Sequence, residues 1–167
     1  MFSTEVVILS LATFVLLYLT VMDWRFFLLP NKANLALAVL GIIYQFTRLN
    51  WADSHAIQYI LSQMVLGAIA GAGIFLFTRW LSLKWKGVEG IGWGDVKFSA
   101  AAGLWLGPGG VGFMIGGGAA LLVLVGFAII LVTKRPLKDF YLPFGAAACP
   151  VMLAFIWLQH FGYLSLL

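Results

Sequence analysis

Cysteine and charged side chains are scarce in this sequence. Cys149 is the sole cysteine among 167 residues, which excludes a disulfide framework and a zinc site built from several cysteines. Charged residues make up 10% of the chain, against about 25% in ordinary soluble domains. So few charges could not cover a soluble surface, and the mean hydropathy is +1.03. The composition therefore predicts a polytopic protein embedded in a lipid bilayer.

Histidine is equally scarce and gives no metal-binding pattern. His55 and His160 lie far apart, near the ends of predicted segments, without a cluster of ligands around them. We therefore expect no metal and no cofactor. The formal charge of +4 does not indicate a nucleic-acid partner, because the basic residues are placed as membrane topology requires.

Long apolar runs predict an all-α membrane protein. A helix that spans a bilayer needs about 20 residues. The fourth run, 95–106, covers only roughly 18 Å at about 1.5 Å per residue, which predicts a short helix that is sheltered or begins within the membrane. We expect one six-transmembrane-helix bundle, a single domain over 1–167, with segments at 5–22, 33–47, 56–81, 95–106, 111–132 and 143–167.

Glycine marks two further features of this bundle. Gly67 and Gly71 have the small-xxx-small spacing that lets membrane helices approach closely, which predicts helix packing there. The sequence from Gly107 to Gly110, which includes Pro108, predicts a turn between the fourth and fifth segments.

The basic residues predict the orientation. Nine of the ten fall in the first, third and fifth junctions, and Arg48 falls in the second. The positive-inside rule assigns the nine to the cytoplasm. Six segments then place both termini on the extracytoplasmic side. The nine are Arg25, Lys32, Arg79, Lys84, Lys86, Lys97, Lys134, Arg135 and Lys138.

Two carboxylates stand out against this apolar background. Gly90, Gly92 and Gly94 lead directly into Asp95, which opens the fourth segment. Asp23 ends the first segment. The predicted topology places both aspartates at the cytoplasmic face, where their contact is permitted but not required by the pattern.

If they meet, the pair has the chemistry of an aspartic protease. Two carboxyl groups a few Å apart cannot both ionise cheaply, so they share a proton. The charged member can deprotonate a water, and the protonated member can hydrogen-bond to a scissile carbonyl. Other interpretations stay open: Asp95 as a helix N-cap, Asp23 as a partner of Arg25, and Lys97 as either a neighbour that tunes Asp95 or an anchor for the helix end.

Three landmarks resemble the type IV prepilin peptidase family. The sequence 92–97, Gly-Trp-Gly-Asp-Val-Lys, is similar to its GxGD signature. Asp23, followed by Pro30, resembles its first aspartate motif, and Pro143–Gly145 resembles its Pro-Phe-Gly motif. The three motifs occur in the family's order, and the resemblance covers essentially the whole chain.

The resemblance implies a membrane aspartic endopeptidase of the bacterial inner membrane. Such enzymes cut the basic leader from type IV prepilins or pseudopilins at the cytoplasmic face, just before the substrate's hydrophobic helix. Asp23 and Asp95 match the catalytic pair. The chain is similar to the short form without the N-methyltransferase region. Supporting or substrate-binding residues are then expected at Pro30, Gly92, Gly94, Lys97, Pro143, Phe144 and Gly145.

Three alternatives remain. Other GxGD proteases, such as preflagellin peptidases or presenilin-like enzymes, use the same chemistry. A small proton-coupled transporter would also use intramembrane carboxylates, although we would then expect them near the bilayer midplane. A subunit that only scaffolds a secretion complex would tolerate substitution of both aspartates.

Overall fold

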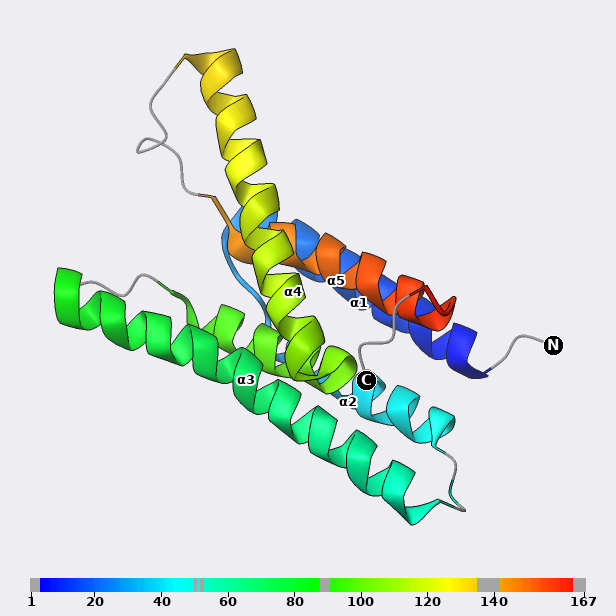
Figure 1. The fold of residues 1–167 in the computed structure, drawn as a ribbon. Helices are drawn as coiled ribbons and strands as arrows, with labels where there is room; N and C mark the ends of the chain where they lie inside the picture. The colour runs from blue at the N-terminus through cyan, green and yellow to red at the C-terminus, as the bar shows by residue number, and fades with distance from the viewer. Residues whose placement is uncertain (1–3, 50, 52, 88–90, 135–141, 164–167) are drawn as a thin grey trace.

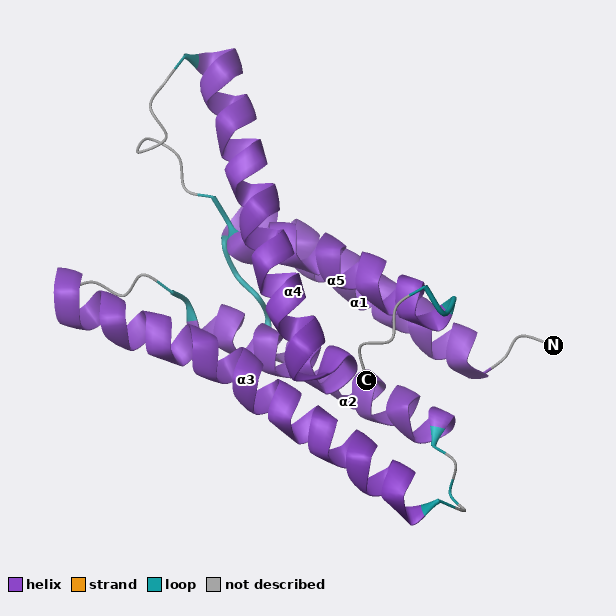
Figure 2. Ribbon diagram, viewed as in Figure 1, coloured by secondary structure: helices purple, strands orange, loops and turns teal. Residues whose placement is uncertain are grey.

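A computed structural model describes residues 4–49, 51, 53–87, 91–134 and 142–163, and this part of the chain contains helices and no strand (Figures 1 and 2). The all-α prediction is therefore confirmed. Gly90, Arg135 and Lys138 lie outside the described residues. The helices are α1 (Thr4–Phe26), α2 (Asn31–Arg48), α3 (Ser54–Lys86), α4 (Trp93–Thr133) and α5 (Phe144–His160).

Three of these helices, α1, α3 and α4, are long and apolar enough to cross a membrane. Helix α4 packs against α2, α3 and α5, whereas α1 packs against α2 and α5. Figure 1 shows α1 and α5 side by side, with α3 on the opposite side of α4. The core consequently lies around the first half of α4, and Phe98, Trp105 and Met114 are among its buried side chains.

The structure describes five helices where the sequence predicts six segments. The predicted fourth and fifth segments form the single helix α4, which is kinked at Gly107, where φ is 67° and ψ is −179°. A left-handed φ suits glycine, and Pro108 suits the first turn of the helix that continues because it has no N–H to leave unpaired. The predicted short fourth helix, 95–106, is thus the first half of α4, and the chain changes direction there without a loop (Figure 1).

Close packing at the predicted small-residue motif is confirmed. A Cβ added to Gly67 would collide with the carbonyl oxygen of Gly103, and one added to Gly71 would collide with that of Ser99. Both partners belong to α4, so α3 and α4 approach along backbone surfaces that only glycine leaves open.

We expect Gly67→Ala to lower the free energy of unfolding by about 1–3 kcal/mol, because the added methyl group must push two backbones apart. Gly73→Ala is the matched control, since a Cβ at Gly73 on the same helix meets nothing within 4 Å. Thermal unfolding in detergent micelles measures the difference. Equal midpoints for the two variants would contradict the packing described here.

Buried polar contacts fasten α2 to α4. The Trp105 indole N–H donates to the carbonyl oxygen of Leu37 at 2.8 Å, and the Gln45 amide donates to the carbonyl oxygen of Trp105, also at 2.8 Å. The Tyr44 ring stacks on Trp105 with 5.1 Å between centroids. These bonds satisfy polar groups that would be costly to bury unpaired.

The start of α1 and the end of α5 lie at the same end of the bundle. The His160 Nδ1 is 3.4 Å from the Glu5 carboxylate and 3.5 Å from the hydroxyl of Tyr44, near the end of α2. The extracytoplasmic location of both termini stays a prediction.

Candidate active site

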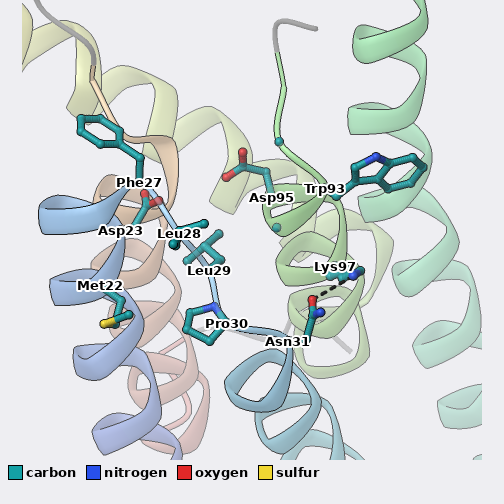
Figure 3. A pocket seen from close by; sticks show the side chains of 12 residues that line it. Met22, Asp23, Phe27, Leu28, Leu29, Pro30, Asn31, Trp93, Asp95 and Lys97 are labelled. Atoms are coloured by element: carbon teal, nitrogen blue, oxygen red, sulfur yellow. Dashed lines mark hydrogen bonds between the residues drawn. The ribbon is translucent and has the colours of Figure 1, made fainter.

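A cavity of about 500 Å³ lies where the end of α1, the linker to α2 and the start of α4 meet. It contains both aspartates that the sequence singled out (Figure 3). Six of the nine residues expected in a site line it, namely Asp23, Pro30, Gly92, Gly94, Asp95 and Lys97.

Asp23 is held in place from two sides. It lies in the last turn of α1, which ends where Phe27 adopts a left-handed φ of 52° and its N–H donates to the Asp23 carbonyl oxygen at 3.0 Å. The Asp23 side chain is only 5% exposed. Its Oδ2 accepts a hydrogen bond of 2.8 Å from the backbone N–H of Ala146 in α5. Asp23 is therefore fixed to α5 through its carboxylate.

Asp95 is the third residue of α4, and the N-cap of that helix is Gly92. The alternative interpretation of Asp95 as the N-cap residue is therefore wrong. The backbone N–H of Gly92 nevertheless donates to the Asp95 carboxylate, as in the reciprocal part of a capping box. Asp95 is partly exposed and extends into the cavity from the side opposite Asp23 (Figure 3).

Leu29 packs between the GxGD motif and the Pro-Phe-Gly motif. A Cβ added to Gly94 would lie 3.0 Å from the Leu29 Cβ, and one added to Gly145 would lie 3.0 Å from both Leu29 methyl groups. Leu29 is buried, and Pro30 follows it as the N-cap residue of α2. The linker between α1 and α2 thus places the Leu29 side chain between the GxGD segment and the start of α5.

Lys97 contacts Asn31 rather than an aspartate. Its Nζ donates to the Asn31 Oδ1 at 2.8 Å, which is the dashed line in Figure 3. This bond links the start of α4 to the start of α2 at the edge of the cavity. Lys97 as a whole is exposed.

Pro143, Phe144 and Gly145 lie behind Asp23 and not along the cavity. Pro143 is the N-cap residue of α5, and the Phe144 ring contacts the ring of Phe75 in α3 with 5.1 Å between centroids. A Cβ at Gly145 would lie 2.8 Å from the Asp23 Oδ2. The segment thus starts α5 where its backbone reaches the aspartate.

The sequence did not reveal the contacts of Arg79, a buried residue near the end of α3. Its Nη1 donates to the carbonyl oxygen of Ile91, and its guanidinium lies over the Trp93 ring, 4.8 Å from the centroid. Both partners precede Asp95 by a few residues. The sequence signal that could have indicated these contacts is a charged residue at the end of an apolar run. A charged side chain that is buried there needs partners to compensate for its lost hydration.

Arg79→Lys is expected to lower kcat/KM about tenfold for the peptide cleavage that the sequence predicts, because lysine keeps the charge but lacks the planar group that stacks on Trp93 and bonds to Ile91 at once. Arg48→Lys is the matched control, since Arg48 stacks on Tyr44 at the far end of the bundle. Steady-state kinetics of both variants measure the effect, and an equal change in the two would exclude a positioning role for Arg79.

No group of three or more His, Cys, Asp or Glu residues that could hold a metal ion occurs in the described ranges. The arrangement of the cavity is instead that of two carboxyl groups brought by separate helices, each with a backbone N–H bound to it. In such a pair one carboxyl group can act as a general base and the other as a general acid.

Apolar helices of bilayer length and a cavity with two carboxyl groups define the class: a helical membrane protein with a candidate acid–base site at one end of its bundle. The chain belongs to the type IV leader peptidase family, whose model matches residues 10–163. The match includes Asp23, Asp95 and the segment 143–145. The resemblance inferred from the motifs is therefore confirmed.

Curated relatives named prepilin leader peptidase/N-methyltransferase are similar to the chain. The protein of Escherichia coli (strain K12) is 37% identical over 91 residues, 54% of this chain and 37% of the relative. That of Pectobacterium carotovorum subsp. carotovorum is 35% identical over 92 residues, 55% and 30% of the two chains. That of Aeromonas hydrophila is 37% identical over 97 residues, 58% and 31%. Each match spans about a third of the relative's length, and no solved structure matches significantly.

Proposed function

We propose that the protein is a prepilin leader peptidase that uses Asp23 and Asp95 as an aspartic catalytic pair. The observation that carries the proposal is that these two carboxyl groups, from α1 and α4, line one cavity of about 500 Å³. Membership of the type IV leader peptidase family supports a peptidase, and the names of the relatives support prepilins as substrates.

In this proposal the pair shares one proton. The ionised carboxylate takes a proton from a water molecule as the water oxygen attacks the scissile carbonyl carbon. The protonated carboxyl group donates its proton to the carbonyl oxygen, which gives a tetrahedral diol. Collapse of the diol breaks the C–N bond, one proton passes to the leaving amine, and the pair regains its shared proton. The N–H groups of Ala146 and Gly92 hold the two carboxyl groups throughout.

We infer that the cavity faces the cytoplasm of a bacterium from its inner membrane. Basic residues gather at the cavity end of the bundle, while Arg48 stands at the end of α2. The positive-inside rule then orients the cavity inward and both termini outward. The kink at Gly107 lets α4 supply two passes, so a six-pass topology is compatible with five helices. The basic residues at the cavity end include Arg25, Lys32, Arg79, Lys84 and Lys97.

The same arrangement suits a substrate that is cut at the membrane surface. A leader cut at the membrane surface, just before an apolar helix, places its scissile bond at the depth of Asp23 and Asp95. Prepilins and pseudopilins have this form. The short form without methyl transfer stays a prediction, as do the supporting roles of Pro30, Gly92 and Gly94.

The test uses the purified protein in detergent with a prepilin that carries a Gly–Phe junction. We expect a product whose new N-terminus is the phenylalanine, identified by mass spectrometry. A folded protein that leaves the prepilin intact, or that cuts within its apolar helix, would refute the proposal. Proton uptake by proteoliposomes without any cleavage would favour a transporter instead.

A further inference from the structure

A second cavity, of about 280 Å³, lies beside the aspartate cavity as a groove between α2 and α3. The first half of α4 forms its floor, and α2 and α3 are not among the described helix pairs that pack closely on each other. Leu35 on its rim is 66% exposed, so the groove opens on the outer surface of the bundle. Four of its nine lining residues are alanines, namely Ala38, Ala68, Ala100 and Ala101.

Asn34 gives an independent indication that the groove takes a ligand. It lines the groove and is only 4% exposed. Its Nδ2 donates to the Leu29 carbonyl oxygen at 3.5 Å, but its Oδ1 has no hydrogen-bond partner in the described part of the chain. A buried acceptor without a donor is unfavourable, and a bound group that brings a donor would relieve this.

The groove is continuous with the candidate active site. Asn31 and Lys97 line both cavities, and their hydrogen bond of 2.8 Å lies at the boundary between them. A chain that leaves the aspartate cavity past this bond therefore enters the groove. The first four N–H groups of any helix lack partners within the helix, so a helix that begins at this point supplies the donors that the Asn34 Oδ1 lacks.

We propose that this groove seats the first turns of the substrate's apolar helix, on the C-terminal side of the scissile bond. The inference rests on the proposed function and adds where the uncleaved part of the substrate binds. The alanines that line the groove allow the close approach by which membrane helices associate. A lipid chain would also suit apolar walls, but it would bring no donor to Asn34 and would have no need to adjoin the aspartates.

Disulfide cross-linking tests the placement. The variant Ala68→Cys, in an Asp95→Asn background that keeps the substrate intact, is mixed with a prepilin that carries one cysteine in the first two turns of its apolar helix. Copper phenanthroline is the oxidant. Cys149 is fully buried, so the new thiol is the accessible one. Because a disulfide needs Cα atoms within about 7 Å, we expect at least about tenfold more cross-linked product than with Ala120→Cys, whose side chain is exposed elsewhere on α4.

A second variant measures the effect on turnover. Ala68→Leu fills the groove. We compare kcat/KM for the whole prepilin with kcat/KM for a leader peptide that ends just after the junction and so has no apolar helix. The variant should lower the ratio of the first value to the second by about tenfold. Ala120→Leu should leave that ratio unchanged. Cross-linking of Ala68→Cys no stronger than that of the control would refute the placement of the substrate helix in the groove, and so would an unchanged ratio for Ala68→Leu. In either case, cleavage by the wild-type protein would still support the proposed function. Absence of wild-type cleavage would count against the proposed function itself.

Discussion

Asn in place of either Asp23 or Asp95 is expected to reduce the rate of prepilin cleavage by about 10³-fold, since a positioned acid or base contributes about 10²–10⁴-fold. Asparagine keeps the size of aspartate and its ability to accept a hydrogen bond. In Asp23→Asn the carbonyl oxygen can still accept the N–H of Ala146, so the α1–α5 contact should persist. The loss would therefore report chemistry and not unfolding. Cleavage under single-turnover conditions measures it.

The control for this experiment is Asp53→Asn. Asp53 caps α3 by accepting the N–H groups of His55 at 2.9 Å and Ala56 at 3.2 Å, and asparagine caps a helix about as well. It does not line the aspartate cavity. This variant should cleave at the wild-type rate. Wild-type rates for Asp23→Asn or Asp95→Asn would remove that residue from the catalytic pair.

Gly145→Val is expected to lower kcat about 100-fold, because displacement of a reacting group by about 1 Å can have that effect. A Cβ at Gly145 would lie 2.8 Å from the Asp23 Oδ2 and 3.0 Å from both methyl groups of the buried Leu29. Neither neighbour can retreat easily, since Asp23 is bound by Ala146 and Leu29 is wedged beside Gly94. The variant therefore has to move the carboxylate, and kcat and KM determined separately will show whether turnover or binding changes.

Gly116→Val provides the comparison. Gly116 also lies within a helix, and a Cβ there meets nothing within 4 Å. The two variants thus share the change of a helical glycine to a β-branched residue and differ in what the side chain meets. If both lose the same activity, the contact between Gly145 and Asp23 has no special importance.

The helical class of the fold was readable from composition, but the number of helices was not. Apolar runs predict helices whether or not a junction interrupts them. The sequence Gly107–Gly110 suits either a loop between two helices or a kink within one, because glycine accepts both backbones. The choice depends on how α4 packs on α3 and α5. The close packing at Gly67 was predictable because its motif encodes a packing geometry, but the motif does not specify α4 as the partner.

For the site, the sequence indicated the side chains but not the backbone groups that hold them. The charge pattern predicted that Asp23 and Asp95 lie at the same face, and both line one cavity. The bond from Ala146 was not readable, since a backbone N–H leaves no trace in residue identity. The pairing of Lys97 with Asn31 was equally hidden, because it depends on the relative placement of α2 and α4.

The most direct test of the central proposal, that two carboxyl groups act as one unit, is a double-mutant cycle on prepilin cleavage. Groups that act together are non-additive: once one is removed, removal of the other costs little more. We predict that Asp23→Asn/Asp95→Asn cleaves at the same residual rate as either single variant. Losses that multiply in the double variant, so that each aspartate contributes independently, would contradict a shared catalytic pair.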